Sequence, residues 1–565
     1  MLTHICLENF KSFKQRAELQ LAPITLLYGP NSSGKSSIIQ AMMYGYEVIA
    51  NDWLDVDQCS LSPIDLGGFW NVLNNQAEQK EITLGFGYTL DDNPAASKAQ
   101  KEFGKMLIEA LESYEYSADA TVTSPSGGGG QNWGYAEFTL AWSGQLKKPY
   151  VSKLSIYLQS GAFPRHGVIS SPCDKQHHVL DVISNPSRQQ VYITNINFEH
   201  ELFSYTTEED VEQHPLSTLL EEMEAVSDPD TGNLCVYLNS MNHNAKPRLG
   251  KALELELMGD RLEEIASEQG GLMFSSDKND SQKYQQLEAE QREINDNLNF
   301  TTELFSQLII TPLHHIALTL EHMAHIGPWR DIPKRNFMPS RSRNSQRWYK
   351  GIAGWDEIYQ CPTSQFDTVS GWMKRLKTGY TLTREDIAPK SSISSVVHLQ
   401  DTSGSSCKPA DVGVGISQVF PIVVAACSPH VGTVAIEQPE LHIHPALQVE
   451  LGDLFSIMAV VSSKLDKKRD YEEYILGHMG PPGCKFLLET HSEHLILRLL
   501  KRIRQSSDGE ELEEVQILTN DDVSIIYLNP SERGVIAKKI RIDDEGEFLD
   551  RWPRGFFAER REELL

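Results

Sequence analysis

The residues with the clearest chemical potential form a glycine-rich segment near the start of the chain. From Gly29 to Ser36 the sequence Gly-Pro-Asn-Ser-Ser-Gly-Lys-Ser has the GxxxxGK[ST] spacing of a phosphate-binding loop. The glycines let backbone N–H groups turn toward phosphate oxygens, and the start of the next helix adds a partial positive charge. Lys35 would reach the β- and γ-phosphates of ATP, and Ser36 would offer its hydroxyl to Mg²⁺. The expected ATP contacts are Gly29, Pro30, Asn31, Ser32, Ser33, Gly34, Lys35, Ser36 and Ser37.

A second segment supplies the acid that such a loop requires. Residues Thr433 to Glu437 form an apolar run that ends in a carboxylate, and Gln438 follows it. We expect Glu437, together with Ser36, to hold Mg²⁺. Gln438 stands where the ATPases that this pattern resembles usually have a glutamate that polarises the water attacking the γ-phosphate. An amide can orient a water but cannot accept its proton as a carboxylate does. The sequence therefore predicts slow ATP hydrolysis, with Glu440 as the alternative proton acceptor.

Composition and charge restrict the classes of partner. The net charge is −27, so the surface on average repels nucleic acid. The stretch from Arg330 to Lys350 is a local exception, with seven basic residues against the single acid Asp331. It is either a solvated face or a nucleic-acid contact.

Cysteine spacing and hydropathy indicate in which cellular compartment the protein is expected. Eight cysteines occur singly, without metal-ligand spacing, which favours reduced thiols and a cytoplasmic location. No run of about 18 apolar residues is present, so we expect no membrane segment.

The elements that must position these residues can be located from the sequence pattern. The apolar run Ile24 to Tyr28 predicts a buried strand before the glycine-rich loop, and helical spacing begins at Ser36. We predict an N-terminal ATPase lobe with a β subdomain over residues 1–205. A helical insertion, acting as a short arm or lid, should cover residues 206–307. A C-terminal ATPase lobe should cover residues 308–565.

Five segments together resemble the ATPase heads of the AAA_15 and OLD-like families, which are akin to SMC and RecF heads. They are Leu7–Phe13, His325–Arg330, Glu437–Pro445, Glu489–Arg498 and Trp552–Phe557. The likeness extends to PtuA-like ATPase subunits of the Septu and retron-associated anti-phage systems. It implies an α/β fold of the ABC/SMC type: a mixed sheet with flanking helices, an antiparallel β subdomain and a helical insertion.

The resemblance also assigns roles to two further segments. In this class a signature turn of one subunit caps the γ-phosphate held by another, and Gly413, Gly415 and Ser417 stand in the corresponding place. It therefore implies a homodimer or a higher homo-oligomer. His491 follows the next apolar strand, where this class has a histidine that contacts the γ-phosphate. The implied catalytic residues are Glu437, Gln438, Glu440 and His491.

The resemblance implies an ATP-gated sensor or scaffold in a defence complex. A separate nuclease of the HNH type is the expected effector, and a retron reverse transcriptase with its RNA–DNA product is a further candidate partner. The chain ends soon after its last strands, so we expect no appended Toprim nuclease. Two alternatives stay open: a DNA-repair ATPase of the RecF/SMC kind that acts on DNA itself, and a nucleotide-binding structural protein that never hydrolyses ATP.

Overall fold

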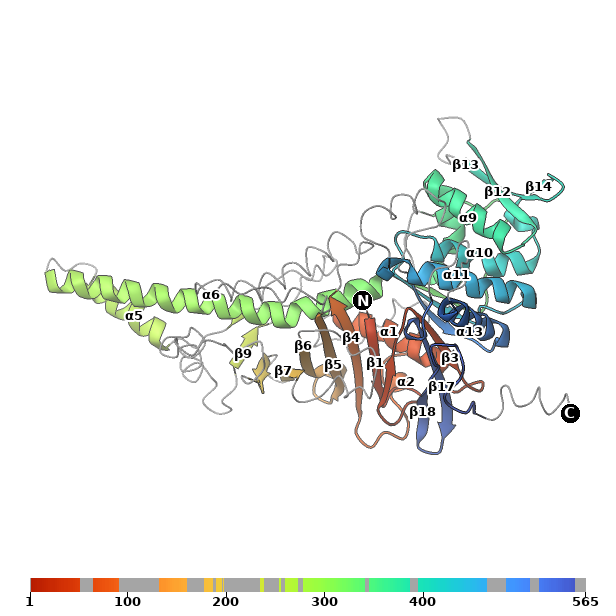
Figure 1. Ribbon diagram of the computed structural model, residues 1–565. Helices are drawn as coiled ribbons and strands as arrows, with labels where there is room; N and C mark the ends of the chain where they lie inside the picture. Colours follow the sequence, from red (N-terminus) through yellow and green to blue (C-terminus); the bar gives the residue numbers. More distant parts are fainter. Residues whose placement is uncertain are drawn as a thin grey trace.

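The computed structural model describes residues 2–50, 65–90, 132–159, 177–185, 190–195, 197, 234–237, 254–255, 260–272, 278–340, 345–386, 395–464, 484–508 and 518–553. These residues form an α/β fold with a mixed sheet, an antiparallel sheet and a long projecting helix, which confirms the predicted fold class (Figure 1). None of the described helices is both long enough and apolar enough to cross a membrane.

The mixed sheet carries the segments that the sequence singled out. Its strands are Met323–Ile326 (β11), Thr433–Glu437 (β15), Lys485–Glu489 (β16), Ile24–Tyr28 (β3), Val523–Ser531 (β17) and Gly534–Ile540 (β18), in that spatial order. All neighbours run parallel except β17 and β18. Every residue of β15, β16 and β3 is buried, as expected for apolar runs covered on both faces.

The antiparallel sheet extends from the start of the chain. Its spatial order is β10-β9-β8-β7-β6-β5-β4-β1-β2. The strands are Leu2–Glu8 (β1), Ala17–Gln20 (β2), Glu81–Leu90 (β4), Asn132–Ser143 (β5), Lys148–Gln159 (β6), His178–Asn185 (β7), Gln190–Thr194 (β8), Leu234–Tyr237 (β9) and Glu254–Leu255 (β10). A short helix, α2 (Phe69–Val72), precedes β4.

Helix α1 (Lys35–Ala50) packs between the two sheets. Its Ile38 and Met42 share one core cluster with the antiparallel sheet and with Leu27 of β3. Leu26 points to the opposite face of β3 and belongs to a second cluster. That cluster contains helices α10 (Val414–Ala426), α11 (Pro445–Lys464) and α13 (Glu493–Ser507), which cover the outer face.

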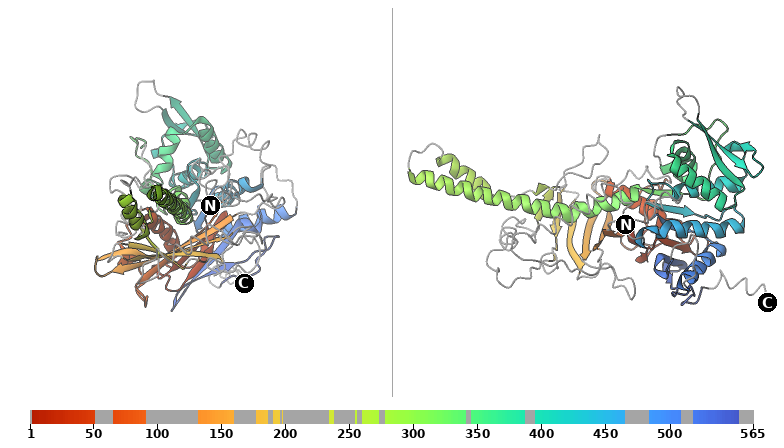
Figure 2. Two further views of the ribbon diagram at one scale, coloured as in Figure 1. Left: turned by 90° about the vertical axis from the view of Figure 1, so that its left-hand side faces the viewer. Right: turned by 45° about the horizontal axis from the view of Figure 1, so that its top comes forward.

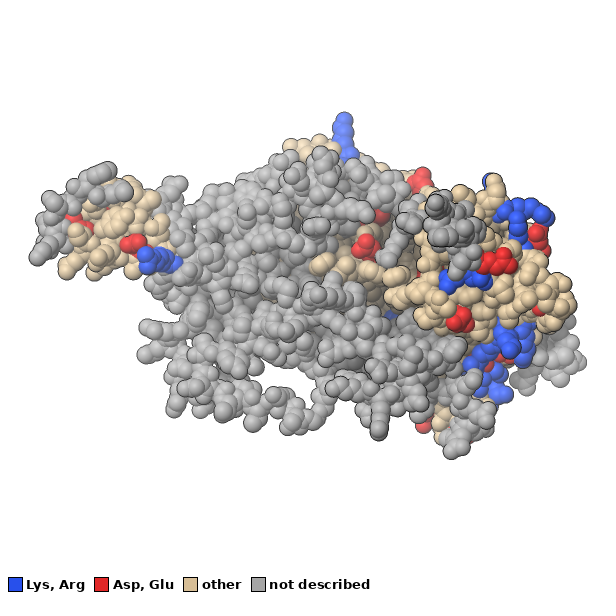
Figure 3. Space-filling model, turned by 90° about the horizontal axis from the view of Figure 1, so that it is seen from above, with Lys and Arg blue, Asp and Glu red and all other residues tan. Residues whose placement is uncertain are grey.

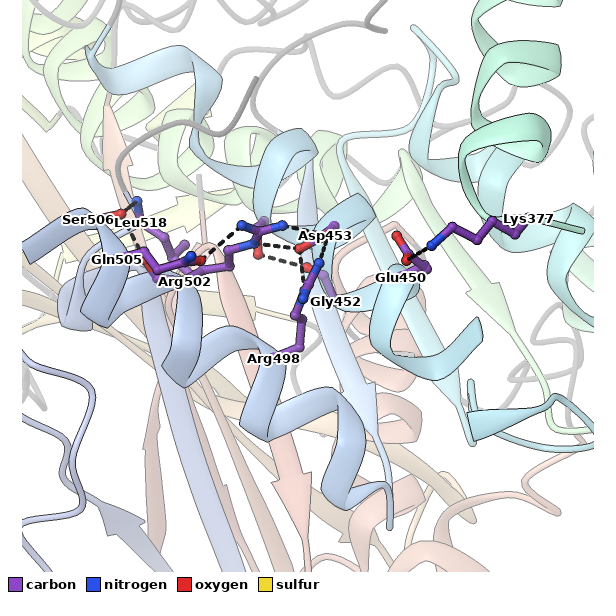
Figure 4. A network of polar contacts seen from close by, with 10 residues as sticks. Lys377, Glu450, Gly452, Asp453, Arg498, Arg502, Gln505, Ser506 and Leu518 are labelled. Atoms are coloured by element: carbon purple, nitrogen blue, oxygen red, sulfur yellow. Dashed lines mark hydrogen bonds and ion pairs between the residues drawn. The ribbon is translucent and has the colours of Figure 1, made fainter. Parts of the chain in front are cut away.

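Helices α11 and α13 are joined by a buried ion cluster. The carboxylate of Asp453 on α11 accepts hydrogen bonds from both Arg498 and Arg502 on α13, at 2.5–2.9 Å (Figure 4). The side chain of Asp453 is only 3% exposed. This cluster holds two helices of the outer layer at a fixed spacing.

A smaller unit adjoins the outer layer. It consists of the helices α7 (Ser345–Tyr349), α8 (Ile352–Gln360) and α9 (Thr363–Arg375) and the strands β12 (Tyr380–Asp386), β13 (Ser395–Asp401) and β14 (Ser406–Cys407). Trp355 of α8 stacks on Phe420 of α10, with 3.8 Å between ring centroids. The unit is therefore packed directly onto α10, the helix that follows the glycine-rich turn at Gly413 and Gly415.

A two-helix arm projects from the body that the two sheets and their helices form. Helix α6 (Lys278–Glu321) leaves the body, and α5 (Asp260–Leu272) lies along its outer part (Figures 1 and 2). Ile265 and Leu287 are buried, and Gln269 of α5 donates a hydrogen bond to Gln291 of α6 at 3.1 Å. The inner end of α6 packs on α1 in the core. The arm is thus continuous with the core.

The described elements differ from the expected division of the chain in two places. Strands β9 and β10 fall inside residues 206–307, which we expected to be helical, and they pair at the edge of the antiparallel sheet. Helix α6 runs without a break through the expected boundary at residue 307. The reason is that Leu308, Leu313 and Ile316 continue an apolar face that packs in the core. The division into an N-terminal lobe, a helical insertion and a C-terminal lobe is therefore our proposal for the domains.

Candidate functional site

The glycine-rich loop lies between β3 and α1, as its spacing predicts. Gly29 has φ 147° and Gly34 has φ 90°, backbone conformations that side chains rarely permit. A Cβ atom on Gly29 would lie 2.5 Å from the carbonyl oxygen of Leu528, and one on Gly34 would lie 2.3 Å from Ser12 Oγ. Both positions therefore favour glycine for conformational reasons, and at Gly29 the contact with a backbone oxygen adds a steric one.

Lys35, the first residue of α1, is folded back onto this loop. Its Nζ donates to the carbonyl oxygens of Gly29 and Pro30, both at 3.0 Å. Its side chain is 3% exposed, and burial lowers its pKa while the Glu489 carboxylate 3.9 Å away opposes that shift. The ammonium thus lies at the mouth of the loop, where a phosphate group would replace two carbonyl partners.

Glu489 is a site residue that the sequence analysis did not assign. Its Oε2 accepts a hydrogen bond from Ser36 Oγ at 2.6 Å. Burial raises its pKa; the Ser36 hydrogen bond opposes this, and the charge of Glu437 adds to it. The sequence marked Glu489 only as the last residue of an apolar strand, and it did not reveal that β16 pairs directly with β3.

Glu437 ends the neighbouring strand, at the same level of the sheet as Glu489. Its Oε1 is 2.8 Å from Nε2 of His325, which comes from the adjacent strand β11. The His325 ring meets Tyr349 edge-on, with centroids 5.0 Å apart. The acid expected to hold Mg²⁺ is therefore oriented by a buried histidine from the segment that resembles the family.

The chain turns sharply after Glu437. Gln438 adopts φ 49°, and its backbone N–H donates to the carbonyl of Glu489 at 2.7 Å. Glu440 points back toward the end of β16, where Oε2 accepts from Thr490 Oγ1 and Oε1 accepts from the His491 N–H, both at 2.7 Å. The structure thus brings Gln438, Glu440 and His491 together at the carboxyl ends of β15 and β16.

His491 has an environment that favours the neutral imidazole. Burial lowers its pKa below the ordinary histidine value, and the positive charge of Lys35 lowers it further. A neutral imidazole at pH 7 can donate one hydrogen bond and accept another. This protonation state permits contact with a phosphate oxygen through its ring N–H.

The glycine-rich turn before α10 lies apart from the loop that begins at Gly29. Gly413 and Val414 are exposed, whereas Ser417 is completely buried. A Cβ on Gly415 would meet the carbonyl oxygen of His442 at 3.2 Å. Among the described residues, no hydrogen bond or ion pair joins this turn to the loop from Gly29 to Ser36. Only the exposed start of the turn is available to another molecule.

The first residue of the basic stretch is buried. Arg330 is 3% exposed and donates to the carbonyl oxygens of Glu437, Gln438 and Gln418, at 2.8, 3.3 and 3.3 Å. Burial lowers its pKa to about 10, against the effect of the nearby carboxylates. Arg330 therefore braces the end of β15 against α10 and is not a surface contact for nucleic acid.

Two further cations of the stretch have acidic partners. Arg347 makes a two-pronged contact with Asp356, at 2.5 and 2.6 Å, and Arg335 pairs with Asp411. Lys334 and Lys350 are exposed. Arg341 and Arg343 lie outside the described residues.

Comparison with known proteins gives one family and several distant structures. The AAA ATPase domain family AAA_15 matches residues 1–496. No curated protein matches the chain.

Solved structures similar to the chain include three SMC heads. The Smc head domain bound to the C-terminal domain of ScpA, from Pyrococcus furiosus, is 10% identical with a TM-score of 0.34, covering 96% of each chain. The SMC head domain from Thermotoga maritima is 7% identical with a TM-score of 0.33, covering 96% of this chain and 99% of that one. The Smc head domain with a coiled coil and joint, from Pyrococcus yayanosii, is 9% identical with a TM-score of 0.34, covering 100% and 99%. Likenesses this distant give no information on ligands or partners.

Proposed function

The chain belongs to the AAA ATPase domain family AAA_15, and from this premise we propose that it binds ATP with Mg²⁺ at the loop from Gly29 to Ser36 and hydrolyses it slowly. The observation that carries the proposal is the meeting of Lys35 and Ser36 with the carboxylate ends of β15 and β16. Phosphate oxygens would take the Lys35 ammonium and the N–H groups at the start of α1.

The residues present fit a magnesium ion. Mg²⁺ prefers oxygen ligands and takes one or two protein carboxylates, with phosphates and water completing its shell. The Ser36 hydroxyl and the Glu437 carboxylate are donors of this kind. Among the described residues, no group of three or more His, Cys, Asp or Glu side chains could hold a metal ion. Phosphate oxygens and water would therefore have to supply the other ligands of the ion. When bound, Mg²⁺ would neutralise charge that develops on the phosphates.

Slow turnover is supported by the positions of the two candidate proton acceptors. Gln438 carries an amide, which can align a water but not take its proton. Glu440 has the right chemistry, but both of its oxygens are held by Thr490 and His491. Each candidate is thus limited as a base, one by its chemistry and the other by its hydrogen bonds.

The experiment that tests this proposal follows ATP on the purified protein. Excess radiolabelled ATP and Mg²⁺ are added, and bound nucleotide and released ADP are measured over time. The proposal predicts stable ATP binding with turnover well below the typical enzyme rate of about 10 s⁻¹. Turnover at tens per second would contradict the slow ATPase, and failure to bind ATP would contradict the whole proposal.

We further propose that the ATPase is a nucleotide-gated homo-oligomeric subunit of an anti-phage complex with a separate nuclease. The resemblance of the Glu437–Pro445 and Glu489–Arg498 segments supports this role. The net charge of −27 and the internal partners of Arg330, Arg335 and Arg347 favour it over a repair ATPase that grips DNA directly. A cytoplasmic location is part of the same proposal.

Phage challenge tests the finer role. The gene with its neighbours is introduced into a sensitive bacterial host, and phage plaques are counted for the parent and for Lys35→Ala. Protection by the parent alone is the expected result. Equal plaque counts for both, alongside tight DNA binding by the purified parent, would favour the repair ATPase instead.

A further inference from the structure

Glu489 differs from the other carboxylates at the nucleotide site in how it is held. Glu440 accepts hydrogen bonds at both oxygens, and Glu437 is tied to His325. Glu489 is contacted by the Ser36 hydroxyl at 2.6 Å and faces the Lys35 ammonium at 3.9 Å. Its side chain is 10% exposed. It is therefore a buried carboxylate whose remaining lone pairs face the phosphate loop.

The charge of this site needs a cation once ATP is present. The charges of Glu437 and Glu440 both act on Glu489 at the end of the sheet, and Lys35 lies 3.9 Å from it. ATP would bring several more negative charges into the same space. Like charges repel strongly where the protein excludes water. A divalent cation between the Glu489 carboxylate and the phosphates would remove this repulsion.

The position of Glu489 favours a metal ligand over a proton acceptor. Its direct partner is Ser36, the residue whose hydroxyl phosphate-binding loops place on Mg²⁺. Strand β16 lies between β3 and β15, so Glu489 stands between Ser36 and Glu437. A proton acceptor would instead face the water beyond the γ-phosphate, which is the place we assign to Gln438.

We propose that Glu489 is a carboxylate ligand of the Mg²⁺ that enters with ATP, acting beside Ser36 and Glu437. The inference rests on the proposed ATP site and adds a residue to it. In the structure the Glu489 carboxylate accepts a hydrogen bond from Ser36 and faces Lys35. Ser36, Glu437 and Glu489 would together supply oxygen ligands of the kind that Mg²⁺ prefers.

The test replaces the carboxylate by the amide of the same shape. Mn²⁺ substitutes for Mg²⁺ because it takes the same oxygen ligands, and its spin resonance reports binding directly. Mn²⁺ is titrated into the protein saturated with a non-hydrolysable ATP analogue. For Glu489→Gln we expect Mn²⁺ affinity to fall at least tenfold, and Glu489→Asp to recover part of it because the charge is kept. Glu385→Gln, at an exposed position on β12, is the matched control.

Analogue binding without metal separates this inference from the proposed function. In EDTA the Glu489→Gln protein should bind the analogue as well as the parent or better, because one negative charge is gone. Unchanged Mn²⁺ affinity and an unchanged spectrum in a folded Glu489→Gln protein would overturn the metal role, and lost hydrolysis in that protein would make Glu489 the proton acceptor. A parent that binds no analogue under any condition would refute the ATP site itself.

Discussion

At the scale of single residues, the backbone turn at Gln438 sets what the site can do. The turn begins where β15 ends and places the Gln438 N–H on the carbonyl of Glu489. A side chain at this position lies beside the strand end that carries Glu437. In the slow hydrolysis that we propose, this amide would align a water without accepting its proton, and that chemistry would limit the rate.

Gln438→Glu is therefore expected to raise ATP turnover. A general base typically contributes about 10²–10⁴-fold, so a rise of at least about tenfold is predicted. Steady-state phosphate release from parent and variant, at saturating ATP, is the measurement. Gln360→Glu, at the exposed end of α8, controls for added charge. A Gln438→Glu protein that binds ATP yet hydrolyses it no faster would show that the amide is not the bottleneck.

Individual residues also show what the sequence could and could not predict. The GxxxxGK[ST] spacing located Lys35 and Ser36 because the motif is local and the loop is built from consecutive residues. Glu489 was missed because its contact with Ser36 depends on β16 pairing with β3, across 453 positions of sequence. Arg330 was counted among surface cations, since a charge run does not reveal which of its members is buried.

At the scale of elements, the helices of the outer layer depend on the buried cluster at Asp453. Burial raises the pKa of its carboxylate, but the hydrogen bonds and charges of Arg502 and Arg498 outweigh this and leave the pKa below the ordinary value. The charged form is therefore stabilised in the folded protein.

Asp453→Asn should destabilise the fold, because two arginines lose their buried anion. Breaking a buried pair in this way costs about 3–5 kcal/mol. Urea unfolding of parent and variant measures the difference, with Asp367→Asn at an exposed position on α9 as the control. Because the folded pKa is lowered, the advantage of the parent should be full above the ordinary aspartate pKa of about 4 and shrink as the pH falls below it. A pH-independent difference would contradict this account.

Elements were predicted best where local pattern and burial agree. The apolar run from Ile24 to Tyr28 is β3, and Thr433 to Glu437 is β15, residue for residue. The strands in the polar region 206–307 were harder to predict. Strands β9 and β10 are short, and they pair with each other and, through β9, with the distant β8, so the local sequence pattern does not indicate them. The arm was predicted only as a helical insertion, because its helices α5 and α6 are held together by contacts that neither helix shows alone.

At the scale of the whole molecule, exposed apolar residues gather beside the glycine-rich turn. Val414 is 51% exposed and Trp329 is 69% exposed. The Trp329 ring lies 5.5 Å from that of His442, whose backbone contacts Gly415. On the face shown in Figure 3, described Lys and Arg side chains lie among Asp and Glu. The surface around Val414 is thus suited to an apolar contact with a second subunit.

Nucleotide-dependent self-association is therefore expected to depend on Val414. A charge at the centre of an apolar contact costs at least about 2 kcal/mol, so Val414→Asp should weaken the dimer about 30-fold. Sedimentation with a non-hydrolysable ATP analogue measures this. Ile536→Asp, equally exposed on β18, is the control. A parent that stays monomeric at micromolar concentration with nucleotide bound would rule out the dimer.

The central claim, that the loop from Gly29 to Ser36 binds ATP, is tested most directly by calorimetric titration of an ATP analogue. Lys35 supplies the buried ammonium that meets the phosphates, and charge-assisted hydrogen bonds of this kind contribute about 1.5–3 kcal/mol each. Lys35→Ala should therefore bind the analogue at least about tenfold more weakly than the parent, while the exposed control Lys334→Ala binds normally. Equal affinity of a folded Lys35→Ala protein and the parent would contradict the account.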